Sequence, residues 1–214
     1  MADPGGEDAF LDQWRPETSS FFWRAKKPVF GGSIFWSPEV EPPDGAEPKV
    51  TLSLDVNATA IETDPLMCDR AVELFVAVAS DLGAFFGAGY VTRGVLAGSR
   101  GAQWYGEGTE NLSSDWISGP WWLGLPVKPT WLSWFGRPYR DLVAASVDGL
   151  SAERERGLLM RLGPTPLDTD QLRGLAPDLP TELLVKVVTR PGEGPMKYIK
   201  EYERTPASHI PSLD

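Results

Sequence analysis

The stretch WISGPWWLGLPVKPTWLSWFGRPY, residues 116–139, carries five of the nine tryptophans of this 214-residue chain. Glycine and proline interrupt it repeatedly, and a regular helix or strand does not need such a composition. Each indole can bury about 150 to 250 Å² and donate its N–H to a neighbouring carbonyl oxygen. We therefore expect most of these rings to fill the space between a sheet and a helix, namely Trp121, Trp122, Trp131 and Trp134.

The segment TDPLMCDRAVELFVAVASDLGAFFG, residues 63–87, predicts one long helix before this stretch. Asp64 can cap the first free amides, and Pro65 suits the first helical position. Gly87 or Gly89 is the expected end of the helix. The expected buried stripe recurs every three to four residues and consists of Met67, Ala71, Leu74 or Phe75, Val78, Leu82 and Phe85.

Other segments predict strands and short helices in no strict alternation. Residues 19–40 indicate strand, turn and strand, and residues 49–62 alternate between an apolar and a polar face. A helix is expected from about Pro138 and another within 168–177, with strands in 156–163 and 181–188. This order predicts an α+β fold, with a mostly antiparallel sheet packed against one long helix and shorter helices.

The domain organisation that we expect is a single domain. Residues 1–18 predict a loose N-terminal lead, residues 19–190 the single α+β domain, and residues 191–214 a polar C-terminal tail. The N-terminus lacks the features of a signal peptide, and every apolar run is too short to span a membrane. These patterns indicate a cytoplasmic protein that contacts no membrane.

The formal net charge of −10 argues against direct binding of nucleic acid, which requires clustered Lys and Arg. The acidity is concentrated in residues 39–81, which hold ten carboxylates and two basic side chains. Two interpretations stay open. The region is either a solvated surface or a face that attracts a basic partner.

No arrangement of residues indicates catalysis. The one histidine, His209, lies near the end of the chain, and the one cysteine, Cys68, lies in the predicted helix as a buried structural thiol. Triads that use histidine, zinc sites and glycine-rich phosphate loops therefore have no candidates. Carboxylates in the loop 106–116 could in principle flank a sugar, although we expect them to be solvated. We predict no enzymatic activity, no cofactor and no metal.

The more polar half of the tryptophan-rich region is the candidate for partner recognition. Two tryptophans flank a loop with three carboxylates, and aromatic anchors beside charged residues are typical of protein interfaces. The candidate partner-binding residues are Trp104, Glu107, Glu110, Asp115 and Trp116.

The run GPWWLGLPVKPTWLSWFGRPYRDLV, residues 119–143, follows a predicted strand and long helix in an acidic chain. In this setting it resembles the immunity proteins of bacterial polymorphic toxin systems, and is most similar to the immunity protein 52 family. The resemblance implies an α+β protein that neutralises one cognate toxin, a nuclease of restriction-endonuclease-like fold that type VI secretion often delivers. It implies no catalytic residues. An acidic inhibitor would complement the basic groove of such a nuclease.

Two other functions stay open at this level. A carbohydrate-active enzyme or lectin could use the tryptophans as a sugar platform, and oligosaccharides would then quench tryptophan fluorescence. A small-molecule binding domain with an aromatic pocket would instead gain thermal stability when its ligand is present.

Overall fold

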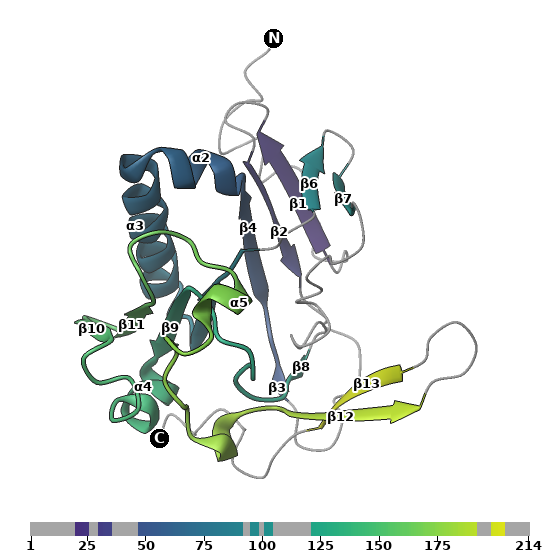
Figure 1. Ribbon diagram of the computed structural model, residues 1–214, viewed down its shortest axis with the longest axis vertical. Helices are drawn as coiled ribbons and strands as arrows, with labels where there is room; N and C mark the ends of the chain where they lie inside the picture. Colours follow the sequence, from purple (N-terminus) through teal and green to yellow (C-terminus); the bar gives the residue numbers. More distant parts are fainter. Residues whose placement is uncertain are drawn as a thin grey trace.

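The computed structural model describes residues 20–25, 30–35, 47–91, 95–98, 101–104, 121–191 and 198–203. Within these residues, helices combine with strands whose pairings are antiparallel, apart from one isolated parallel bridge between Leu125 and Leu184. The predicted α+β class is confirmed. The strands divide among several small sheets, and Figure 1 shows the helices α2 and α3 along one side of the molecule.

A four-stranded antiparallel sheet contributes several residues to the hydrophobic core. Its order is β10 (Ser151–Arg154), β11 (Gly157–Arg161), β9 (Leu132–Gly136) and β5 (Phe86–Gly89). The inner strand β9 comes from the tryptophan-rich stretch, and all five of its residues are buried. Trp134 is paired in register with Leu159 on one side and Gly87 on the other. The tryptophan-rich stretch therefore supplies the central strand of this sheet.

The helix α3 (Pro65–Asp81) follows the short helix α2 (Ala58–Thr63) and packs against β9 and β5. The carboxylate of Asp64 accepts hydrogen bonds from the backbone N–H groups of Leu66 and Met67, at 3.0 and 3.3 Å, so the predicted cap is confirmed. The predicted end at Gly87 or Gly89 is wrong. The chain leaves the helix at Gly83, whose φ of +60° suits glycine, and both later glycines lie in β5.

The buried face of α3 differs from the predicted stripe. Its fully buried residues are Cys68, Val72 and Ala79, and Cys68 is the buried thiol that the sequence predicts. Leu82, which we expected in the stripe, is 65% exposed. Of the alternatives Leu74 and Phe75, Phe75 packs against the core and Leu74 is 49% exposed. The helix is therefore rotated relative to the predicted stripe, and the ring of Phe75 packs close to Gly87 of β5 on the buried side.

A three-stranded antiparallel sheet follows the order β1 (Ser20–Ala25), β2 (Phe30–Phe35) and β4 (Thr51–Val56). This confirms the two strands expected in residues 19–40 and the strand expected after Lys49. The residues between β1 and β2, where the turn is expected, lie outside the described structure. The apolar face predicted for β4 is not fully covered, because Leu54 and Val56 are 37% and 38% exposed.

Shorter elements complete the described fold. They are β3 (Glu47–Pro48) paired with β8 (Trp121–Trp122), β6 (Val95–Gly98) paired with β7 (Gly101–Trp104), α4 (Arg137–Val143), α5 (Thr169–Leu172), the 3-10 helix η2 (Thr181–Leu183), and β12 (Lys186–Pro191) paired with β13 (Tyr198–Glu203). Asp168 and Gln171 form a capping box on α5, which lies within the helix expected in residues 168–177. The strand expected at residues 181–188 begins only at Lys186, after η2. Part of the expected tail is strand β13.

The burial of the indole rings explains why this stretch is rich in tryptophan. Trp122, Trp131 and Trp134 are buried, as predicted, and the side chain of Trp121 lies outside the described structure. Each of the three buried indoles donates its N–H: Trp122 to the hydroxyl of Tyr139 at 2.6 Å, Trp131 to the carbonyl of Gly163 at 3.3 Å, and Trp134 to the carbonyl of Ala84 at 3.0 Å. Burial with a satisfied N–H makes these rings core residues.

Candidate interaction surface

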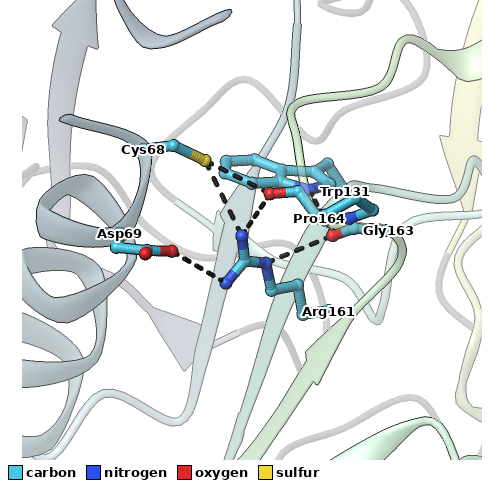
Figure 2. A network of polar contacts seen from close by, with 6 residues as sticks. All are labelled: Cys68, Asp69, Trp131, Arg161, Gly163 and Pro164. Carbon is cyan, nitrogen blue, oxygen red and sulfur yellow. Dashed lines mark hydrogen bonds and ion pairs between the residues drawn. The ribbon is translucent and has the colours of Figure 1, made fainter. Parts of the chain in front are cut away.

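Arg161 on β11 contacts α3 at the buried Cys68 and at the exposed Asp69 (Figure 2). Its guanidinium donates to the carboxylate of Asp69 at 3.4 Å and to the sulfur of Cys68 at 3.7 Å, both on α3. It also donates to the carbonyl oxygens of Gly163 and Pro164. Burial of the Cys68 thiol raises its pKa, with a smaller opposite effect from Arg161. These contacts fix the helix against the loop that follows β11.

The ring of Trp131 lies beside the same network (Figure 2). The central carbon of Arg161 lies 5.8 Å from the centre of the Trp131 ring, within the range of a cation–π contact. The thiol of Cys68 donates to the carbonyl of Pro164 at 3.4 Å. Because the inner face of α3 is attached at several points, its outer face has a defined orientation toward solvent.

The outer face of α3 carries two parallel rows of side chains, each with a spacing of four residues. We call the first the apolar ridge; it consists of Leu66, Arg70, Leu74, Val78 and Leu82. We call the second the acidic ridge; it consists of Asp69, Glu73, Ala77 and Asp81. Rows with this spacing form the ridges by which helices pack on one another.

Exposure distinguishes the apolar ridge from an ordinary helix surface. Its three leucines are 58%, 49% and 65% exposed in chain order. Single exposed leucines are normal on a protein surface, but here they recur every eight residues along one ridge. The ridge therefore presents repeated apolar contact points that no described part of the chain covers.

The charge of this region is negative and exposed. Residues 58–82 hold five carboxylates and one arginine, all exposed. Arg161 forms an ion pair with Asp69, and Arg156 donates to the carbonyl of Ser80 at 3.2 Å, so two basic groups lie at the edges of the helix. The middle of the acidic ridge, at Glu73, has no described basic side chain in an ion pair with it. A partner that binds here meets carboxylates first.

The candidate residues from the sequence fall mostly outside the described structure. Trp104 ends strand β7, where its backbone pairs with Val95 of β6, and its side chain is not described. The other four, Glu107, Glu110, Asp115 and Trp116, lie outside the described residues. The described part of the chain therefore does not test whether the five lie together, and their role stays a prediction.

Sequence reasoning missed the exposed leucines, although a signal was present. At about 100° per residue, the charged residues of α3 gather on one side of the helix. The direction opposite to them passes through Cys68, Phe75 and Ala79, which the structure places toward the core. A prediction that placed the charged residues of α3 toward solvent, even where leucines lie beside them, would have given the correct buried face.

A second cluster joins Lys49 to the aromatic core. Its ammonium nitrogen lies 5.7 Å from the centre of the Trp122 ring, next to the β3 and β8 pair. The Trp122 ring in turn meets Phe85 edge to face, with ring centres 4.8 Å apart. Burial lowers the pKa of Lys49 from its ordinary value of 10.5 to about 8. The cluster is a partly buried cation against an aromatic wall.

The described residues contain neither a cluster suited to a metal ion nor a helix suited to a membrane. No group of three or more His, Cys, Asp or Glu side chains in this part of the chain is placed to hold a metal ion. None of the described helices has the length and apolar character required to cross a membrane.

Comparison with known proteins identifies no relatives. No protein-family model matches the chain, and neither curated proteins nor solved structures give a significant match.

Proposed function

We propose that this chain is an immunity protein that binds and neutralises a cognate protein toxin, a basic nuclease of restriction-endonuclease-like fold. The observation that carries the proposal is the exposed, predominantly acidic surface of residues 58–82. Nucleases hold phosphate groups with Lys and Arg, so their substrate grooves are basic. An acidic surface accelerates association with such a groove and competes with nucleic acid for it.

Features of the chain other than charge support the same proposal. The resemblance of residues 119–143 to the immunity protein 52 family is independent of the acidic helix, because that stretch forms the core. An antagonist requires no catalytic group and acts in the cytoplasm, where a delivered nuclease would reach nucleic acid. We also propose that Trp104 and the loop to Trp116 contribute contacts to the toxin.

The burial of tryptophan weighs against the carbohydrate alternative. All three tryptophan side chains that the structure describes, those of Trp122, Trp131 and Trp134, lie in the core. A sugar platform requires rings whose faces are open to the ligand, so it would have to use other tryptophans of the chain.

The proposal predicts a specific gene arrangement and a specific rescue. A large reading frame whose product ends in a nuclease-like domain should lie beside the gene of this chain. Expression of that domain alone in a bacterial host should degrade nucleic acid and stop growth, and co-expression of the full chain should restore growth. The purified chain alone should hydrolyse no nucleic acid, peptide or glycoside.

The control is a catalytically inactive form of the nuclease domain, which should still form a complex with the chain in size-exclusion chromatography. An immunity protein of an unrelated toxin should neither bind nor rescue. Absence of both rescue and complex formation with the neighbouring domain would rule out the proposal.

A further inference from the structure

We propose that the outer face of α3 is a docking surface for a basic amphipathic helix of the partner protein, seated between the apolar ridge and the acidic ridge. This inference rests on the proposed function for the identity of the partner as a toxin. It rests on the geometry of α3 for the place and chemistry of binding.

The two ridges define the shape of the complementary surface. A helix that packs with its own four-residue ridge in the groove between them lies at an interaxial distance of about 8 to 10 Å. On one side of the groove it meets the exposed Leu66 and Leu74, and on the other side Glu73. The ridge from Leu66 to Leu82 rises about 24 Å along the axis of α3, and a partner helix seated in the groove beside it crosses α3 at about −50°.

The charge of the surface selects the partner. A helix with an apolar stripe flanked by Lys or Arg would bury its apolar residues against the leucines and place its cations on the acidic ridge. A second copy of this chain is disfavoured, because its own acidic ridge would face like charges that Arg70, and Arg161 and Arg156 at the edges of the helix, offset only in part. The expected occupant of this surface is therefore a basic helix of the partner protein and not a second copy of this chain.

The contacts that attach α3 to the sheet favour an outer face that already has its binding conformation in the free protein. Arg161 joins the helix to β11 and to the loop at Gly163 and Pro164 (Figure 2), and Asp64 caps its first turn. A surface that keeps its shape in the free protein loses less conformational entropy when it binds. The partner would dock without a rearrangement of the helix.

The first arm of the experiment uses a defined probe. We would synthesise a Leu and Lys peptide of about 18 residues, long enough to form a helix, with leucines at helical spacing. The matched control peptide has Glu in place of each Lys. Binding to the full chain is measured by fluorescence anisotropy at about 50 mM and about 500 mM sodium chloride, so that screening of charge can be separated from apolar contact.

Two surface variants are compared with two matched controls. Leu66→Ser with Leu74→Ser should weaken binding of the Lys peptide about tenfold at both salt concentrations, because it removes apolar contact. Glu73→Lys with Asp81→Lys should weaken it about tenfold at low salt and much less at high salt. The controls change equally exposed residues elsewhere and should leave affinity unchanged: Leu142→Ser with Leu175→Ser, and Glu155→Lys with Asp178→Lys.

The second arm uses the nuclease domain encoded beside the gene of the chain, with the same variants and with Glu107→Lys, Glu110→Lys and Asp115→Lys combined. Both α3 variants should lose rescue and complex formation, whereas the two control variants should keep them. If the wild-type chain rescues but the α3 variants rescue equally well, the docking surface is wrong and the proposed function stands. Selective loss in the loop variant alone would move the interface to residues 104–116.

The two proposals fail separately. If the chain binds the Lys peptide through α3 but neither binds nor inhibits the nuclease domain, the docking surface stands and the toxin assignment is wrong. Equal binding of the Lys peptide to wild type and to both α3 variants overturns the docking surface. A concentration-dependent homodimer that the leucine variant abolishes would overturn it as well.

Discussion

The indole N–H of Trp134 donates to the carbonyl oxygen of Ala84 over 3.0 Å, which joins the centre of the four-stranded sheet to the turn that follows α3. Trp134 is fully buried, and Ala84 lies one residue after Gly83. The contact therefore connects the tryptophan-rich stretch with the helix that displays the candidate interaction surface.

Replacement of Trp134 tests the core assignment. Trp134→Ala should lower the free energy of unfolding by about 3 to 5 kcal/mol, through lost transfer energy and the cavity that remains. Trp134→Phe keeps an aromatic ring but loses the hydrogen bond to Ala84, and should cost less. Urea unfolding monitored by circular dichroism measures both. A melt of Trp134→Ala that matches wild type would mean that the ring is not in the core.

The close approach of Gly157 to the same ring gives a second test. A Cβ atom at this position would lie 2.6 Å from Cζ2 of Trp134 and 2.7 Å from the carbonyl oxygen of Phe135. Gly157→Ala should therefore cost about 1 to 3 kcal/mol by overpacking. Gly174→Ala is the comparison, because its Cβ meets nothing within 4 Å and only the positive φ of 81° opposes it. We expect distortion of the near-ultraviolet tryptophan signal only in Gly157→Ala, and an undisturbed signal there would contradict the packing.

The Arg161 network predicts a change in thiol reactivity. Arg161→Met removes the hydrogen bonds to Cys68, Asp69, Gly163 and Pro164, and should loosen α3 so that Cys68 reacts faster with a thiol reagent. The rate of labelling with a chromogenic disulfide measures this. Arg173→Met is the control, because its ion pair with Asp170 is exposed and contributes little. Equal labelling rates in both variants would show that Arg161 does not protect the thiol.

The pKa of Lys49 predicts a pH dependence of stability. Its value is about 8 in the folded protein and 10.5 ordinarily, so between these values the unfolded chain binds more protons. The contribution of Lys49 to stability therefore rises as the pH increases from about 8 toward 10.5, and its desolvation cost is complete below about 8. The stability of Lys49→Met relative to wild type should accordingly fall over this range.

The measurement for Lys49 is urea unfolding of both proteins from pH 7 to 10. Burial raises the pKa values of Cys68 and of Tyr90, where Asp55 adds to the effect, and these groups lower stability at high pH. Because both proteins contain them, their effect cancels in the difference. A difference that stays constant with pH would show that Lys49 titrates normally.

Local signals in the sequence predicted local structure well. Asp64 and Pro65 located the start of α3, because capping depends on residues that are neighbours in the chain, and a short helix was expected within residues 168–177, where α5 lies. The burial of the tryptophans was also predictable from their size and from the absence of charge around them. These features require no knowledge of distant contacts.

Features that depend on tertiary contacts were not predictable. The periodicity of α3 allows more than one buried face, and packing against β5 and β9 selects the face with Cys68, Val72 and Ala79. The end of α3 at Gly83 follows from the pairing of Phe86 with Phe135, which are far apart in the sequence. The division of strands among sheets likewise depends on pairings that no local pattern encodes.

The place of β9 between β5 and β11 has a consequence for the order in which the chain can fold during synthesis. Strand β5 is made well before its partner Leu132–Gly136, so a nascent chain that ends before Leu132 has no strand against which α3 and β5 can pack. The buried residues of α3, Cys68, Val72 and Ala79, then lack this packing partner until β9 has been synthesised. Such long-range pairing slows folding relative to local contacts. The tryptophan-rich stretch therefore has to be synthesised before α3 can pack against β9 and take up a fixed orientation.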